Sequence, residues 1–278
     1  MCILLKIMIK YLVKIIAMLN NRLPAVMELE FARVQGKGFG GESFFEEAEI
    51  ALRFCKQLND KTYLSNSLIK KKDLIIFDVG ANIGSYTESI LKLSPNSQIF
   101  AFEPSAISGA IFLDKFKEKT NVHFFNLALS NETSFTTLFS DYLGSPISSL
   151  AKRRLDHFGK NFFYEEKIAT DTLDGFCAKN NLVPDILKMD VEGHEFNILL
   201  GALKIINKIS VIQFEFGGCN IDTRTFFQDF WYFFKEHQFT VYRITPIGVN
   251  RIREYTESDE YFLTTNFVAV NNRISNYM

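Results

Sequence analysis

From residue 74 onward, short apolar runs alternate along the chain with segments of helical periodicity, and no other feature constrains the fold as strongly. The apolar runs have the length of strands and lack the polar alternation of a half-exposed sheet. Strands that alternate with helices form a parallel sheet with right-handed crossovers. We therefore predict buried strands at Leu74–Val79, Gln98–Glu103, Val122–Leu127, Ile186–Val191 and Val211–Phe216.

Helices between these strands and two further strands complete the predicted fold. Val241–Ile244 and Phe262–Val270 have no long helix between them, so we expect an antiparallel hairpin at the sheet edge. The prediction is a doubly wound, Rossmann-like α/β fold with a mostly parallel seven-stranded sheet. The predicted helices are Ser85–Leu93, Ala106–Lys117, Glu192–Ile206 and Thr223–His237.

The N-terminal residues read as an extension to this domain. We divide the chain into an amphipathic helix at 1–22, a helical lead-in at 23–72 that includes a helix at Phe44–Leu58, and the α/β domain at 73–272. Lysines at positions 6, 10 and 14 interrupt the apolar first 19 residues and fall on one helix face. Such a helix suits peripheral contact with a membrane, or packing on the domain or on a second subunit, and the sequence leaves both open.

Composition excludes some functions. The formal net charge of −1 provides no positive field to attract nucleic acid. The cysteines are scattered without a CxxC pair, which argues against a zinc site or a disulfide framework and predicts a reducing, cytoplasmic location. Peripheral contact at the inner membrane face and homo-oligomer formation stay open. The four cysteines are Cys2, Cys55, Cys177 and Cys219.

A glycine-containing turn follows the first strand, where open α/β sheets bind ligands. Gly80 and Gly84 remove side chains where a ligand approaches the backbone, and Asn82 tolerates a left-handed turn. Backbone N–H groups at the start of the next helix suit a ligand carboxylate. The alternative is that the glycines only make a tight turn.

The second and third strands end in residues that suit a nucleoside. Glu103, followed by Pro104, can accept hydrogen bonds from both hydroxyls of a ribose. Asn126–Leu129 includes Ala128 and offers small apolar side chains to an adenine. A nicotinamide-dependent oxidoreductase is an alternative, but the Gly80-x-x-x-Gly84 turn lacks the three-glycine pattern suited to a pyrophosphate.

The fourth strand ends in a dense group of charged residues. Asp190 and Glu192 point the same way if the strand continues through them, and Glu215 at the end of the fifth strand should lie alongside. Buried charges need partners, so packing explains this group poorly. A salt bridge from Lys188 to a neighbouring acid, with Glu195 solvated, is the simpler account of part of it.

A long segment interrupts the regular alternation between the third and fourth strands. Thr133–Ser140 and Lys167–Thr170 are candidate extra strands, and Asp141–Glu166 is a candidate lid over the site or a variable surface loop. Its arginines suit a phosphate or carboxylate on a substrate. The polar residues of interest are Ser145, Ser148, Ser149, Arg153, Arg154 and His157.

Taken together, these motifs resemble the FkbM family of methyltransferases. The resemblance covers about residues 74 to 216 and extends through the trailing strands to near 270. It implies S-adenosylmethionine as methyl donor and O-methylation of a sugar, surface glycan or related natural product. The matching segments are Asp78–Gly84, Phe102–Pro104, Asn126–Ser130, Thr172–Asp174, Asp185–Glu195 and Phe214–Glu215.

The same resemblance implies which residues hold the donor. The expected donor-binding residues are Asp78, Gly80, Ala81, Asn82, Gly84, Glu103, Pro104, Ala128 and Asp190. A binding subunit that keeps the fold without catalysis is a further alternative.

A sugar hydroxyl is a poor nucleophile, so a general base would speed the transfer. We favour Asp190 over His194 as the base, because His194 sits further into the following helix. Glu215 is the third candidate catalytic residue. A magnesium ion held by Asp190 and Glu215 is possible but ranks below direct base catalysis.

Overall fold

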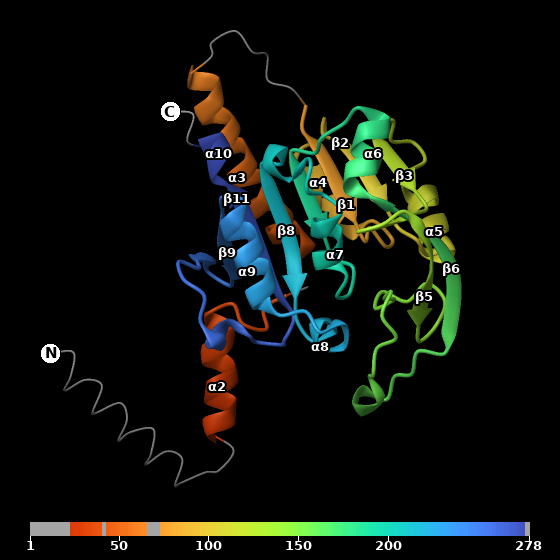
Figure 1. Ribbon diagram of the computed structural model, residues 1–278, viewed down its shortest axis with the longest axis vertical. Coiled ribbons are helices and arrows are strands. Elements are labelled where there is room, and N and C mark those ends of the chain that lie inside the picture. The colour runs from red at the N-terminus through yellow and green to blue at the C-terminus, as the bar shows by residue number, and fades with distance from the viewer. Residues whose placement is uncertain (1–22, 41–42, 66–72, 276–278) are drawn as a thin grey trace, which may run out of the picture.

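The computed structural model describes residues 23–40, 43–65 and 73–275, so the predicted helix at 1–22 lies outside the described residues. Figure 1 shows a twisted central sheet with helices on both faces and a small second sheet at its side. Within the described ranges, no helix combines the length and apolarity needed to cross a bilayer.

The elements follow the predicted alternation of strands and helices. The helices are α2 (Leu23–Val34), α3 (Phe44–Ser65), α4 (Ser85–Leu93), α5 (Ala106–Phe116), α6 (Leu173–Asn180), α7 (Glu195–Leu200), α8 (Cys219–Thr223), α9 (Phe227–Glu236) and α10 (Asn272–Ser275). The strands are β1 (Ile75–Val79), β2 (Gln98–Phe102), β3 (Val122–Phe125), β4 (Ala128–Ser130), β5 (Ser134–Ser140), β6 (Tyr164–Thr172), β7 (Ile186–Met189), β8 (Val211–Phe216), β9 (Phe239–Thr245), β10 (Gly248–Arg251) and β11 (Thr265–Asn271). Short 3-10 turns are η1 (Asp156–Phe158), η2 (Ile206–Lys208) and η3 (Glu257–Asp259).

The central sheet has eight strands in the order β10-β9-β11-β8-β7-β1-β2-β3. The five strands from β8 to β3 are parallel, and β11, β9 and β10 are antiparallel to their neighbours. The mostly parallel α/β sheet is therefore confirmed, but the predicted number of seven strands is wrong. The missed strand, β10, is short and half polar, so it carries no apolar run.

The antiparallel edge also differs from the prediction. β9 and β11 do pair antiparallel, with Phe267 opposite Arg243. β11, however, lies inside the sheet between β8 and β9, and the edge hairpin is formed by β9 and β10. The sequence does not reveal that β11 lies between β8 and β9, because a strand that pairs with β8 has the same apolar pattern as one that pairs only with β9.

Alternating side chains of the strands fill a core on each face of the sheet. Ile76 of β1 packs in the cluster that includes residues of α3 and α4, whereas Phe77 packs in the cluster on the opposite face with residues of α6, α7 and α9. Phe214 stacks on Phe230 and on Phe267, with centroid distances of 5.0 and 5.3 Å. The abundant phenylalanines thus serve mainly as core residues.

The strand order reverses beside β1, because β2 and β3 extend the sheet on one side and β7 and β8 on the other. In doubly wound sheets a crevice forms at this switch point, outside the carboxyl ends of the strands. The loops after β1, β2, β7 and β8 therefore surround the place where a ligand would bind.

The segment between β3 and β7 builds a second sheet of three strands in the order β4-β6-β5. β5 lies within one residue of the predicted Thr133–Ser140, and β6 begins earlier than the predicted Lys167–Thr170. Residues 141–163 connect β5 to β6, and part of this loop lies against the site.

Two predicted boundaries near the site are wrong. β7 ends at Met189, so the strand does not continue through Glu192, and α7 covers only Glu195–Leu200 instead of Glu192–Ile206. The intervening turn has positive φ angles at Glu192 (54°) and Gly193 (100°), which neither a strand nor a helix permits. The predicted helix Thr223–His237 begins later, as α9 (Phe227–Glu236), and α8 (Cys219–Thr223) before it was not predicted.

Candidate active site

A cavity of about 390 Å³ opens at the carboxyl ends of the parallel strands. Its walls come from the turn after β1, the ends of β2, β7 and β8, strand β4, and residues 145–150 of the long loop. This volume is in the range of pockets for small molecules, about 300 to 1,000 Å³. The cavity therefore occupies the place predicted for a nucleoside-bearing ligand.

Glycine is required in the β1–α4 turn for close packing. Gly80 has φ 74°, and a Cβ there would lie 1.9 Å from the carbonyl oxygen of Asp190. Gly84 has φ 84°, and its Cβ would lie 2.2 Å from the ring of Phe116, outside the cavity wall. Asn82 takes the predicted left-handed conformation (φ 46°). Gly80, Ala81 and Asn82 line the cavity, whereas Gly84 joins α4 to α5.

Asp78 lies beneath the cavity and does not line it. Its carboxylate is fully buried, accepts a hydrogen bond from Thr87 Oγ1 (2.7 Å) and pairs with Lys188 Nζ (3.1 Å). Lys188 also donates to the carbonyl of Gly80 (3.1 Å). Burial alone would lower the pKa of Lys188, but the Asp78 carboxylate reverses this and raises it. The pair thus fixes the turn, and the expected direct contact of Asp78 with the donor is not what this geometry offers.

Glu103 is held at the end of β2 with its carboxylate facing the cavity. Its two oxygens accept the backbone N–H groups of Asn82 (2.9 Å) and Ser105 (2.8 Å). Burial raises the pKa of Glu103 to about 6, against these hydrogen bonds. Each carboxylate oxygen accepts more than one hydrogen bond, so both remain able to bind a ligand hydroxyl. Pro104 and Ala128 line the adjoining wall.

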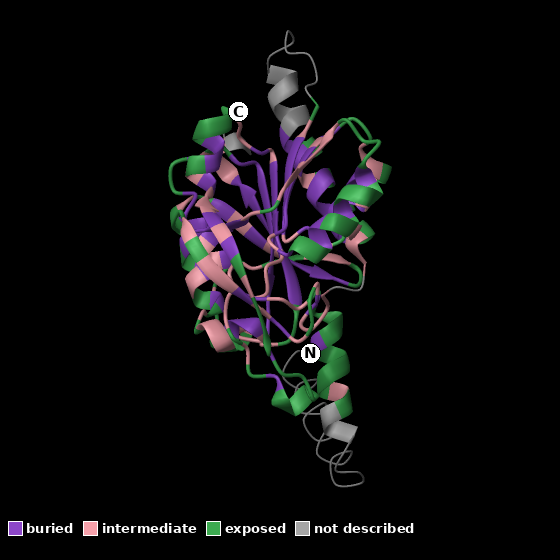
Figure 2. Cartoon of the chain, turned by 90° about the vertical axis from the view of Figure 1, so that its right-hand side faces the viewer, coloured by how far each residue is buried: buried purple, intermediate pink, exposed green. Residues whose placement is uncertain are grey.

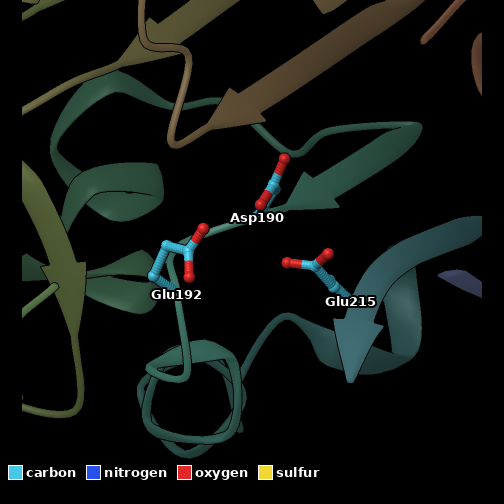
Figure 3. A group of neighbouring side chains, drawn as sticks. All are labelled: Asp190, Glu192 and Glu215. Carbon is cyan, nitrogen blue, oxygen red and sulfur yellow. The ribbon is translucent and has the colours of Figure 1, made fainter. Parts of the chain in front are cut away.

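Three carboxylates meet at the ends of β7 and β8, and we call them the acidic group: Asp190, Glu192 and Glu215. One oxygen of each lies within 4.8 Å of the others, and Figure 3 shows them facing a common space. Asp190 and Glu192 come together because of the turn after Met189, and not because the strand continues through them as predicted. Glu192 was absent from the predicted catalytic set.

The surroundings of Glu192 and Glu215 favour their protonated forms. Burial and the negative charge of Asp190 raise the pKa of Glu192 to about 7. Burial and the neighbouring acids raise the pKa of Glu215 well above its usual range, and Glu215 shares a hydrogen bond with Asp190. Because like charges this close disfavour one another, Glu192 and Glu215 retain protons to higher pH than exposed glutamates do.

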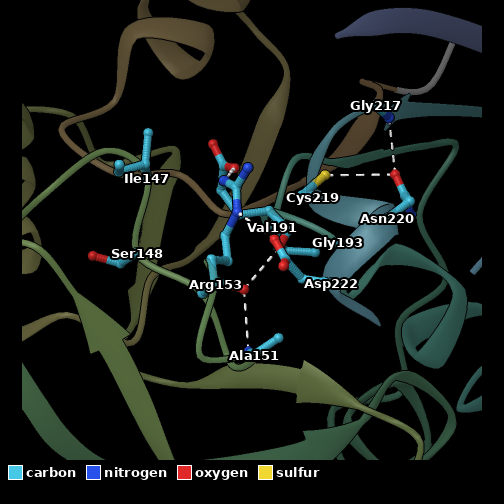
Figure 4. A network of polar contacts seen from close by, with 12 residues as sticks. Ile147, Ser148, Ala151, Arg153, Val191, Gly193, Gly217, Cys219, Asn220 and Asp222 are labelled. Atoms are coloured by element: carbon cyan, nitrogen blue, oxygen red, sulfur yellow. Dashed lines mark hydrogen bonds and ion pairs between the residues drawn. The ribbon is translucent and has the colours of Figure 1, made fainter. Parts of the chain in front are cut away.

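Arg153 of the long loop pairs with the acidic group from outside. Its guanidinium contacts the Glu192 carboxylate and lies 3.5 Å from Asp222. Ser149 donates to the Glu192 carbonyl (2.8 Å), and Figure 4 shows this network around Arg153. Arg153 is therefore already paired, and of the two arginines considered for substrate anions only Arg154 has an exposed side chain.

His194 lies at the N-terminus of α7 with both ring nitrogens occupied. The Asn197 amide donates to Nδ1 (3.0 Å), which leaves the ring proton on Nε2, 2.9 Å from Ser130 Oγ. Burial lowers the pKa of His194 to about 4. The ring faces the cavity, but it has no free lone pair to accept a proton.

Glu195 serves the structure of the turn. It is fully buried and accepts the backbone N–H groups of Val191 (2.9 Å) and Gly193 (3.3 Å). The simpler account, in which Glu195 is solvated, is therefore wrong for this residue. Burial raises the pKa of Glu195 to about 7.

A polar network on the far wall escaped the sequence analysis. Glu47 of α3 accepts hydrogen bonds from Gln213 (3.0 Å) and Asn266 (2.7 Å), and Tyr86 donates to Gln213 (2.9 Å). Glu47, Tyr86 and Asn266 line the cavity. The residues come from four elements that are distant in sequence. The only one with a local sequence signal is Glu47, and an acid at the start of a helix is equally well explained by the helix dipole.

Comparison with solved structures gives matches of low TM-score and low identity. A crystal structure of methyltransferase FkbM from Methylobacillus flagellatus KT matches with a TM-score of 0.44 and 15% identity, over 90% of this chain and 59% of that one. The Methanococcus jannaschii fibrillarin pre-rRNA processing protein matches with a TM-score of 0.42 and 12% identity, over 72% of this chain and 67% of that one.

Sequence comparison is more specific. The 2-O-methyltransferase NoeI of Sinorhizobium fredii (strain NBRC 101917 / NGR234) is 26% identical over 160 residues, which cover 54% of this chain and 66% of that protein. The chain thus spans less than two thirds of the length of this relative and of the first structure. The model of the methyltransferase FkbM domain matches residues 78–241, more than half of the chain and all four strand ends around the cavity. The chain therefore belongs to the FkbM methyltransferase family.

Proposed function

We propose that the protein transfers the methyl group of S-adenosylmethionine to a hydroxyl of a sugar, surface glycan or related natural product. The observation that carries this proposal is the position of Glu103, whose buried carboxylate faces the same cavity as the acidic group. One end of the cavity thus suits the ribose of the donor, and the other suits a hydroxyl that must lose a proton.

The cavity fits the methyl donor chemically. Glu103 would hold the ribose hydroxyls, Ala128 and Pro104 would flank the adenine, and the turn of Gly80, Ala81 and Asn82 would hold the amino-acid end. The bound donor supplies a methyl group on a positively charged sulfur. The negative acidic group complements that positive charge.

Asp190 is the residue we assign as general base. It lines the cavity, and its side chain is one third exposed. Glu215, with its raised pKa, keeps its proton and donates a hydrogen bond to Asp190, which orients that carboxylate. Taking the proton from the acceptor hydroxyl makes its oxygen a better nucleophile, while alignment with the methyl–sulfur bond supplies much of the remaining rate.

The hydroxyl acceptor rests on two supports. The relative NoeI is named a 2-O-methyltransferase. In addition, the acidic group provides an acceptor for a hydroxyl proton. Against nicotinamide chemistry, the Gly80-x-x-x-Gly84 turn lacks the three-glycine pattern suited to a pyrophosphate. A catalytically idle subunit would bind the donor but turn over no acceptor, and the test below separates that case.

A panel of methyl glycosides of the common neutral sugars tests the proposal. With S-adenosylmethionine present, we expect S-adenosylhomocysteine to form together with a glycoside that is heavier by one methyl group. Asp190→Asn protein serves as the control for background hydrolysis of the donor. Donor binding without methylation across the whole panel would contradict the sugar assignment and favour the idle subunit.

Binding of a metal ion is a second candidate function of the acidic group, because carboxylate oxygens are ligands for Mg²⁺. The group of Asp190, Glu192 and Glu215 meets this requirement in number and spacing. We nevertheless expect the transfer rate to be unchanged after removal of divalent cations with EDTA, since the base mechanism needs none. A loss of rate that Mg²⁺ restores would assign the acidic group to a metal instead.

A further inference from the structure

Exposed apolar side chains gather at the end of the molecule that holds the cavity. Helix α2 leads into the turn at Gly36, which packs against Ile244 and Thr245 at the end of β9. Four of these exposed apolar side chains belong to α2. The other four lie in loops that follow strands: two after β5, one after β8 and one after β9. We call this set the apolar end: Val26, Leu29, Phe31, Val34, Phe158, Phe163, Ile221 and Ile247, all at least half exposed.

The two figures agree on this arrangement. α2 and the tip of the loop between β5 and β6 both lie at the lower end in Figure 1 and in the view turned by 90° in Figure 2. Figure 2 also shows that α2 is exposed over most of its surface. The arrow of β8 in Figure 1 points to the same end, as the carboxyl end of a parallel strand should.

Helix α2 lacks the packing that usually stabilises a helix in water. Of its residues from 26 to 34, only Ala32 is buried. Four large apolar side chains on a projecting helix exceed the scattered exposure that is normal on a soluble monomer. Most helical stability comes from burial of an apolar face, so α2 needs a second surface.

The chemistry of the neighbouring sequence indicates a lipid surface. The 19 N-terminal residues are strongly apolar and carry lysines only at positions 6, 10 and 14. On the loop side, Lys152, Arg154 and Lys160 are exposed beside Phe158 and Phe163, although Lys152 and Lys160 also form surface ion pairs with Glu165 and Asp141. Apolar side chains combined with cations bind anionic lipid at the depth of the headgroups.

We propose that the apolar end docks on a membrane surface that contains anionic lipid, with α2 lying in the interface. The loops that wall the cavity belong to the same end, so docking places the cavity next to the bilayer. If the proposed methyl transfer is correct, the acceptor hydroxyl then belongs to a lipid-linked molecule. The docking itself does not depend on that activity.

Vesicle sedimentation of the full chain tests the docking. We expect binding to vesicles of phosphatidylcholine with phosphatidylglycerol, weaker binding to phosphatidylcholine alone, and release by salt. The double variant Leu29→Glu with Phe31→Glu should bind at least about tenfold more weakly, because charges replace side chains that enter the interface. Leu203→Glu, at another half-exposed apolar position in the turn after α7, is the matched control and should bind like the wild type.

Two results would overturn the proposal. One is that the wild-type protein does not sediment with anionic vesicles, or that the α2 double variant sediments with them as well as the wild type does. The other is a dimer in light scattering that the double variant converts to a monomer, which would make α2 a protein interface. Calorimetric binding of S-adenosylmethionine to each variant checks its folding, and it also reports separately on the proposed function.

Discussion

At the scale of single residues, the protonation of the acidic group decides which side chain accepts the substrate proton. Arg153 pairs with Glu192 and favours its charged form, whereas Glu215 is buried among negative charges and keeps its proton. Asp190 accepts the hydrogen bond of Glu215 and is the most exposed of the three. His194 has no free lone pair, because Nδ1 already accepts a hydrogen bond from Asn197. The assignment of Asp190 over His194 therefore follows from hydrogen bonding more than from ordinary pKa values.

Replacing Asp190 by Asn should lower kcat by about a hundredfold or more, because general base catalysis contributes about that much. The dissociation constant of S-adenosylmethionine should change little. His194→Gln should retain most of the activity, since His194 acts only by filling space and bonding Ser130 and Asn197. Steady-state kinetics with a glycoside acceptor, alongside calorimetry, gives both quantities. Full activity in Asp190→Asn, or its loss in His194→Gln alone, would reverse the assignment.

Buried Glu195 links stability to pH. Its pKa is raised to about 7 in the folded protein, so between about pH 4.5 and 7 the folded state keeps a proton that the unfolded state has lost. The stability that this proton contributes is full below pH 4.5 and declines as pH rises through 7. Glu195→Gln removes the titration.

We therefore expect the free energy of unfolding of Glu195→Gln, relative to the wild type, to rise by about 2 kcal/mol from pH 5 to pH 7.5. Urea unfolding at several pH values measures this difference. Comparison with the wild type cancels the shared contributions of Glu103, Glu192 and His194. A difference that is constant with pH would show that Glu195 has an ordinary pKa.

At the scale of elements, the β1–α4 turn holds the end of β1 against the end of β7. Gly80 leaves room for the Asp190 carbonyl, and Lys188 of β7 reaches back to the Gly80 carbonyl. The cavity floor is thus built from two strand ends in contact. Any side chain at position 80 would separate them and move Asp190.

Gly80→Ala should destabilise the protein by about 3 kcal/mol, from the left-handed backbone together with the overlap at Asp190. Gly159→Ala is the matched control: Gly159 has φ 66° but nothing within 4 Å of a new Cβ. Its cost should be about 1 kcal/mol, from the backbone alone. Urea unfolding of both variants gives the comparison. Equal losses would show that contact with Asp190 is unimportant.

Sequence patterns predict elements well where one signal is strong. The five parallel strands were found because each is a mostly apolar run, although β3, at the sheet edge, is only half-buried and not buried as predicted. β10 was missed because Gly248–Arg251 is half polar and its pairing with β9 is the only reason it is a strand. The turn after β7 was missed because Glu192 adopts a positive φ that its residue type does not favour.

At the scale of the whole molecule, parallel topology explains why much of the site could be predicted. Carboxyl ends of parallel strands meet at one edge, so Gly80, Glu103 and Asp190 converge without further information. The network of Glu47, Gln213 and Asn266 could not be predicted, since it depends on where α3 and β11 pack on the sheet. Burial of Asp78 under the cavity depends likewise on Lys188 and Thr87.

The central claim is that the cavity at the sheet edge binds the methyl donor through Glu103. Calorimetric titration with S-adenosylmethionine and with S-adenosylhomocysteine tests it most directly, with Glu103→Ala protein of verified folding beside the wild type. We predict micromolar binding of both ligands to the wild type and no measurable binding to the variant. Absence of binding to the wild type, or binding that is indifferent to Glu103, would contradict the account.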